Sequence, residues 1–170
     1  MLAATAGARL GAQSANGADV KAAFLYNFAK FVEWPASALP AGQPIAVGIF
    51  GNNEIADSLT RLAAGKPVGG HPIQIKRVAT TDDPATFHVL FIDNSEQARA
   101  NELVRRIGKA SVLSVSDVPR FLDSGGVIQL RTEDNRLRFD VDLQRAQDSR
   151  LVINSKLLAL AGAVTPAKTY

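Results

Sequence analysis

The run from Phe87 to Ile92 constrains the fold of this chain more than any other segment. Its residues are apolar almost without a break, and His88 is the one polar member. A short apolar run of this kind is typical of a central parallel strand that is covered on both faces. The run therefore predicts an α/β protein in which helices pack on a mostly parallel sheet.

The segments on both sides of this run alternate between strand and helix patterns, as a layered α/β sandwich requires. The first helix carries apolar residues at spacings of three and four, with Asp19 as its predicted N-cap and Trp34-Pro35 as its predicted end. The expected elements are helix 19–34, strand 44–50, helix 54–64, strand 73–78, helix 94–108, strand 111–115 and a helical turn 118–122.

The pattern changes after the glycines at 125 and 126. Residues 126–131 and 136–143 are two alternating segments joined through Glu133-Asp134-Asn135, so we expect an antiparallel hairpin at one edge of the sheet. Apolar residues between Leu151 and Ala163 predict a C-terminal helix.

A length of 170 residues is consistent with a single domain, because domains commonly hold about 100–200 residues. We expect residues 18–164 to form it and residues 165–170 to be a tail. Residues 1–17 are rich in alanine and glycine, and we interpret them as a signal remnant or a disordered tail. The best apolar stretch, Leu157 to Val164, is shorter than the roughly 20 residues that a membrane span needs.

Composition narrows the possible chemistry. The net charge is +3, from 19 basic and 16 acidic residues that are interspersed, which disfavours a nucleic-acid footprint. The chain has no cysteine, so disulfides, thiol catalysis and thiolate metal sites are excluded.

Two histidines are the candidates for metal binding or base catalysis. Neither His71 nor His88 has a second ligand at metal spacing, so we predict no metal site and no cofactor. We interpret His88 as a hydrogen-bonded core residue and His71 as a turn residue. A Ser–His–acid triad stays open, but no Gly-x-Ser-x-Gly motif marks a nucleophile, and we predict that the protein is not an enzyme.

Two aspartates follow neighbouring predicted strands. Asp93 follows the central strand and Asp117 the next one, where open α/β sheets place ligand crevices, so the two could line a ligand pocket. The simpler interpretation is that Asp93 caps the following helix. A phosphate-accepting receiver would need carboxylates at Gly51-Asn52-Asn53, and a dinucleotide loop at Gly48 to Gly51 lacks its third glycine.

Two other features indicate a docking surface. Glu33 and Trp34 stand at a predicted helix end, and tryptophan is enriched at interaction hot spots. Arg136, Arg138 and Asp140 alternate along the hairpin, where an edge can bind a partner. The alternatives are a packing tryptophan and an ordinary solvated edge.

Several of these segments together resemble the YfiR-like family, in the right order over about residues 20–162. The motifs that carry the resemblance are 21–35 (KAAFLYNFAKFVEWP), 45–51, 87–92, 112–117, Phe121, 125–128, 137–142 (LRFDVD) and 152–161. Two positions depart from the family pattern: Asp142 stands where relatives usually carry Asn, and the cysteines of redox-sensitive members are absent.

This resemblance implies a periplasmic protein that binds the periplasmic part of a membrane-bound diguanylate cyclase and restrains it, so that it controls cyclic di-GMP signalling and biofilm formation. It also implies a homodimer and possible sequestration by an outer-membrane lipoprotein. It supplies no catalytic residues. The alternative function is a periplasmic small-molecule sensor with its pocket near Asp93 and Asp117.

Overall fold

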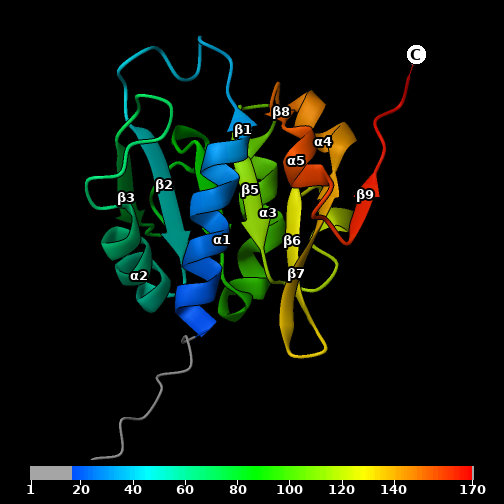
Figure 1. The fold of residues 1–170 in the computed structure, drawn as a ribbon. Helices are drawn as coiled ribbons and strands as arrows, with labels where there is room; N and C mark the ends of the chain where they lie inside the picture. Colours follow the sequence, from blue (N-terminus) through cyan, green and yellow to red (C-terminus); the bar gives the residue numbers. More distant parts are fainter. Residues whose placement is uncertain (1–16, 170) are drawn as a thin grey trace, which may run out of the picture.

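The computed structural model describes residues 17–169, which form a layered α/β fold around a seven-stranded sheet (Figure 1). The sheet order is β3-β2-β4-β5-β6-β7-β9. Its strands are β2 (Ile45–Phe50), β3 (Ile73–Arg77), β4 (Val89–Ile92), β5 (Leu113–Ser116), β6 (Ile128–Glu133), β7 (Arg136–Asp142) and β9 (Ala163–Thr165). All neighbouring pairs are parallel except β6 and β7. The predicted fold class is therefore confirmed.

Helices cover both faces of this sheet. They are α1 (Gly17–Phe31), α2 (Asn53–Ala63), α3 (Gln97–Ile107), α4 (Leu143–Asp148) and α5 (Ser155–Leu158). Figure 1 shows α1 across one face and α3 behind the sheet, and each face buries its own apolar cluster. All four residues of β4 are buried, which confirms the prediction of a central strand covered on both sides.

The hairpin of β6 and β7 has the expected turn. Asp134 and Asn135 both have positive φ values, 49° and 57°, as a two-residue type I′ turn requires. β9 adds a short parallel strand outside Asp140, Val141 and Asp142, so only the half of β7 nearest the turn lacks an outer neighbour among the described residues. Thr165 therefore belongs to a strand, not to the expected tail.

The predicted C-terminal helix over 151–163 is wrong. This stretch contains β8 (Val152–Ile153), the single turn α5, and the start of β9. β8 pairs with β1 (Val32–Glu33) as a separate two-stranded antiparallel sheet, and Asn154 then caps α5 through the backbone N–H of Lys156. Pairing with distant strands overrides the helical spacing of the leucines.

The same pairing corrects the end of the first helix. α1 ends at Phe31, three residues before Trp34, because Val32 and Glu33 join β8 and Asn154 donates to the Phe31 carbonyl at 2.9 Å. Asp19 lies inside the first turn and is not the N-cap. Its carboxylate instead accepts a 2.5 Å hydrogen bond from Ser58 of α2. The predicted signal remnant over 1–17 lies outside the described residues, except Gly17 in α1.

The segment between β5 and β6 also differs from expectation. The predicted turn over 118–122 is displaced, and a 3₁₀ turn instead covers Leu122–Ser124. Phe121 is fully buried, and a Cβ built on Gly126 would overlap its ring. A glycine is thus required at position 126 by close packing against Phe121.

Candidate functional site

The carboxyl edge of the sheet brings Asp93 and Asp117 together. β4 and β5 are neighbours with Ile92 opposite Ser116, so the two aspartates leave adjacent strand ends. Between α1 and this edge, Lys21 places its Nζ 2.6 Å from Asp117 Oδ2. Sequence reasoning predicted the two aspartates but missed the lysine, because it stands 96 residues from its partner.

Asp93 caps the 3₁₀ turn Asn94–Glu96 that leads into α3, so its capping role is at the start of the predicted helix and not at the first residue of α3 itself. Its side chain is buried and accepts hydrogen bonds from the Ser95 backbone N–H at 3.0 Å and the Asn52 amide at 3.2 Å. Burial by itself would raise the pKa of Asp93. The bonds from Ser95 and Asn52 and the nearby charge of Lys21 outweigh burial and hold this pKa below its ordinary value.

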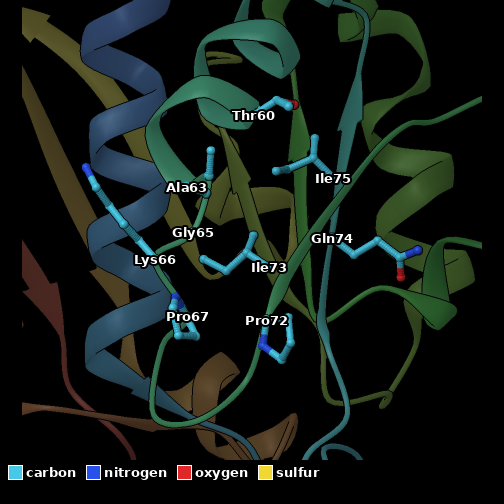
Figure 2. A pocket seen from close by; sticks show the side chains of 10 residues that line it. Thr60, Ala63, Gly65, Lys66, Pro67, Pro72, Ile73, Gln74 and Ile75 are labelled. Atoms are coloured by element: carbon cyan, nitrogen blue, oxygen red, sulfur yellow. The ribbon is translucent and has the colours of Figure 1, made fainter.

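This cluster is therefore largely satisfied from within the fold. Lys21 neutralises Asp117 and Asn52 contacts Asp93, although Oδ1 of Asp117 is buried without a hydrogen-bond partner. The groove between α2 and β3 (Figure 2) does not have Asp93 or Asp117 in its wall, and neither does the groove between α1 and β7. A ligand pocket at this edge stays a prediction.

His88 has the core role that was predicted for it. Its Nδ1 accepts the Ala46 backbone N–H at 2.9 Å, and its Nε2 lies 2.9 Å from the Ala38 carbonyl. A ring that accepts at Nδ1 and donates at Nε2 is the neutral Nε2–H tautomer. Both ring nitrogens are thus hydrogen-bonded to the backbone, so His88 has no free nitrogen to act as the base of a triad.

His71 has the predicted turn role. Val68 and His71 form an isolated bridge around Gly69-Gly70, and the His71 Nδ1 lies 2.7 Å from the Gln43 carbonyl. Among residues 17–169 there is no group of three His, Cys, Asp or Glu side chains placed to hold a metal ion.

The five predicted contact residues lie in separate parts of the structure. Glu33 is exposed on β1, while Trp34 is half-buried and donates its indole N–H to the His88 carbonyl at 3.1 Å. Arg136 and Arg138 are exposed on β7, and Figure 1 places the hairpin turn at the opposite end of the sheet from β1. The structure does not gather these side chains into one compact site.

Asp140 is bonded within the chain, so its carboxylate is less available to a partner than those of exposed residues. The Nε of Arg131 donates to Asp140 at 2.8 Å, and the Nη1 of Arg131 donates to Glu133 at 2.6 Å. Hydrogen bonds to Asp140 and Glu133 raise the pKa of Arg131 above its ordinary value. The hydrogen bond and the charge of Arg131, with a smaller effect of Arg138, lower the pKa of Glu133.

An apolar groove runs between α1, β7 and α5. Aromatic and leucine side chains form most of its wall, with Asn27 and Arg138 as the polar lining, and its volume is about 330 Å³. Its apolar lining is Phe24, Phe28, Phe31, Leu137, Phe139, Leu157 and Leu160. Leu160 is 68% exposed, and Arg138 is the one predicted contact residue in the wall. We call this feature the α1–β7 groove.

Sequence reasoning missed this groove. The helical spacing predicts one apolar face for α1, and Phe28 is indeed buried, with its ring 5.1 Å from that of Phe139. Phe24 and Phe31, however, are only half-buried. The sequence signal for it is that Phe24, Phe28 and Phe31 stand at spacings of four and three and so share one side of α1.

The structure is thus a mostly parallel α/β fold with an apolar groove that has one basic side chain, Arg138, in its wall. The chain belongs to the family described as YfiR/HmsC-like (DUF4154), whose model matches residues 18–162. The predicted resemblance is thus confirmed, and this family is one of periplasmic regulators, not of catalysts. A search of curated proteins finds no match to the chain. Across residues 17–169, every helix is too short or too polar to cross a bilayer.

Proposed function

We propose that this chain is a periplasmic regulator that binds the periplasmic part of a membrane-bound diguanylate cyclase and restrains it. The output would be lower cyclic di-GMP and less biofilm. Membership of the YfiR/HmsC-like family supports the regulatory role. The observation that carries the binding role is the α1–β7 groove, an apolar feature rimmed by the exposed Leu160 and Arg138.

The groove has the chemistry of a site for an amphipathic segment. Burying an apolar side chain contributes about 1.5–3 kcal/mol, and several phenylalanine and leucine side chains are available here for a partner to cover. A helix that lays its apolar face into a groove is a recurring mode of recognition. Arg138 adds a cation at the wall, which favours an acidic residue next to the apolar anchors of the partner.

Restraint needs no chemistry in this mechanism. A regulator that binds the inactive form of the cyclase more tightly than the active form shifts the enzyme toward the inactive form. Glu33 and Trp34, which follow directly after the Phe31 end of α1, form a second contact area in this proposal, and Arg136 extends the basic side of the hairpin. An outer-membrane lipoprotein that covers the same groove would release the cyclase.

The proposal is tested by adding the purified chain to membranes that contain the cyclase and measuring cyclic di-GMP formation. The wild type should inhibit, and Arg138→Ala should need a several-fold higher concentration for the same inhibition. Arg105→Ala is the matched control, because Arg105 is exposed on α3 at the other face of the sheet. Absence of inhibition by the wild type, at any ratio to the cyclase, would refute the proposed function.

The small-molecule sensor is the weaker proposal. Lys21 already neutralises Asp117, and the carboxylate of Asp93 already accepts hydrogen bonds from Asn52 and Ser95. A ligand at this edge would have to displace contacts that hold α1 to the sheet. A thermal-shift screen with nucleotides, amino acids and aromatic metabolites separates the two proposals.

A further inference from the structure

A hollow lies at the amino end of β4 and β5, the end of these strands away from Asp93 and Asp117. Its volume is about 410 Å³. Its wall is formed by residues 37–38, residues 85–88 before β4, residues 110–111 before β5, and Arg150 after α4. It shares no residue with the α1–β7 groove or with the groove between α2 and β3. We call this feature the Arg150 hollow.

Arg150 gives this hollow its charge. The side chain is exposed, and its guanidinium forms no hydrogen bond or ion pair with any other residue of the range 17–169. An arginine side chain stays positively charged in proteins. No Asp or Glu stands among the described residues of the wall to oppose that charge. The hollow therefore favours an anion.

The backbone of Arg150 supplies a second observation. Its φ of 58° lies in the left-handed region, which costs free energy for any residue with a Cβ and which glycine adopts without that cost. Within residues 17–169, no contact of the guanidinium offsets the cost. Non-glycine residues held in such conformations cluster at binding and catalytic sites. A ligand on the guanidinium would give the arginine a role at a position that suits glycine.

A buried hydroxyl in the same wall lacks a partner. Ser111 is 7% exposed, and its Oγ accepts or donates no hydrogen bond among the described residues. Buried polar groups are normally hydrogen-bonded, and a ligand in the hollow would supply the missing partner. Rotation about the Cα–Cβ bond moves a serine hydroxyl between staggered positions, so Ser111 can turn to donate to an oxyanion.

Two other polar side chains of the wall are already occupied. Thr86 donates its hydroxyl to the Asp83 carbonyl at 2.7 Å, and both ring nitrogens of His88 are bonded to the backbone. Arg150 and Ser111, with the exposed Ser37, are therefore the donors available to an anion.

We propose that the Arg150 hollow binds a small organic monocarboxylate, whose two oxygens lie on the guanidinium of Arg150 and one of which accepts from Ser111. The planar fork of arginine matches a carboxylate through two parallel hydrogen bonds. One guanidinium balances one negative charge. A phosphate monoester carries about −1.5 to −2, so a carboxylate is the better match.

The rest of the wall suits the organic part of such a ligand. Phe87 and three alanines, at positions 38, 85 and 110, form its apolar lining. The volume also falls within the roughly 300–1,000 Å³ that is typical of small-molecule sites. A carboxylate with a short apolar body should therefore bind more tightly than acetate, which has only a methyl group to bury.

NMR titration of the purified, ¹⁵N-labelled chain at neutral pH tests the proposal, with acetate, hexanoate and benzoate as probes. Hexanoate or benzoate should bind saturably and shift the amide signals of Ala110, Ser111 and Arg150. Benzamide, which has the shape of benzoate without its charge, should bind at least about ten-fold more weakly than benzoate.

Substitutions separate the guanidinium from the rest of the hollow. Arg150→Gly suits the left-handed backbone and should fold, yet it should weaken carboxylate binding at least about ten-fold. Arg150→Lys keeps the charge but loses the fork, so its loss should be smaller. Ser111→Ala should weaken binding about three-fold.

Arg120→Gly is the matched control. Arg120 is also exposed and left-handed, with a φ of 60°, but it follows β5 at the opposite end of the strand and pairs with Asp123. This variant should bind the carboxylates as the wild type does.

Failure of all three acids to bind saturably, or equal affinity of the wild type and Arg150→Gly, would overturn the proposal. The titration contains no cyclase, so neither result bears on the proposed function. In a thermal-shift screen, a shift that Arg150→Gly abolishes belongs to this hollow and not to the edge at Asp93 and Asp117.

Discussion

The ammonium group of Lys21 lies 2.6 Å from Oδ2 of Asp117 and ties α1 to the carboxyl end of β5. The two side chains are 23% and 16% exposed. Lys21→Met would leave a mostly buried carboxylate without its cation, which costs about 1–3 kcal/mol of unfolding free energy. Urea unfolding measures this loss, and Lys109→Met, at an exposed position, serves as the control. Equal midpoints for the two variants would show that the pair contributes nothing.

Acid should weaken the fold in part through Asp93. Its pKa in the folded protein is below the ordinary value of 3.8, so its contribution to stability is complete above that value and is lost as the pH falls through the folded pKa. The unfolding free energies of the wild type and Asp93→Asn should therefore differ most near neutral pH. The difference should shrink below about pH 3.8. A difference that is independent of pH would contradict the account of Asp93.

The end of α4 holds a residue in a conformation that suits glycine. Arg150 has a φ of 58°, its N–H donates to the Gln147 carbonyl, and the Leu151 N–H donates to the Ala146 carbonyl. These two bonds form a Schellman motif, in which the left-handed position is usually glycine. We expect Arg150→Gly to stabilise the protein by about 0.5–1 kcal/mol in thermal or urea unfolding.

Arg150→Ala separates backbone strain from the loss of the guanidinium. Alanine keeps a Cβ at the left-handed position and should give no gain. If alanine stabilises the protein as much as glycine does, strain at this position is not the cause.

Much of the fold could be predicted from short-range pattern. The apolar run before Asp93 is a buried central strand, and the Asp134-Asn135 turn closes the hairpin with the geometry that its residues favour. The wrong elements are those whose partners are distant in sequence. Helical spacing after Leu151 is genuine, but pairing of Val152 with Glu33 replaces a helix by a strand.

The candidate site was predictable to a similar extent. That Asp93 and Asp117 meet follows from the parallel register of their strands, and the place of Asp93 before a helical pattern predicts its capping role. The approach of Lys21 depends on how α1 packs across the sheet, which no local pattern specifies. The α1–β7 groove depends in the same way on how far α5 stands from α1. Its exposed Leu160 lies in the stretch for which the sequence predicts a helix that the structure does not contain.

The central claim is that the α1–β7 groove binds the cyclase, and calorimetric titration of the purified chain with the cyclase's periplasmic part tests it most directly. Leu160 is 68% exposed, so Leu160→Asp should fold normally, yet it places a charge at the groove. The account predicts saturable binding by the wild type and Leu160→Met, and a loss of at least about ten-fold in affinity for Leu160→Asp. Equal affinity of the wild type and Leu160→Asp would contradict it.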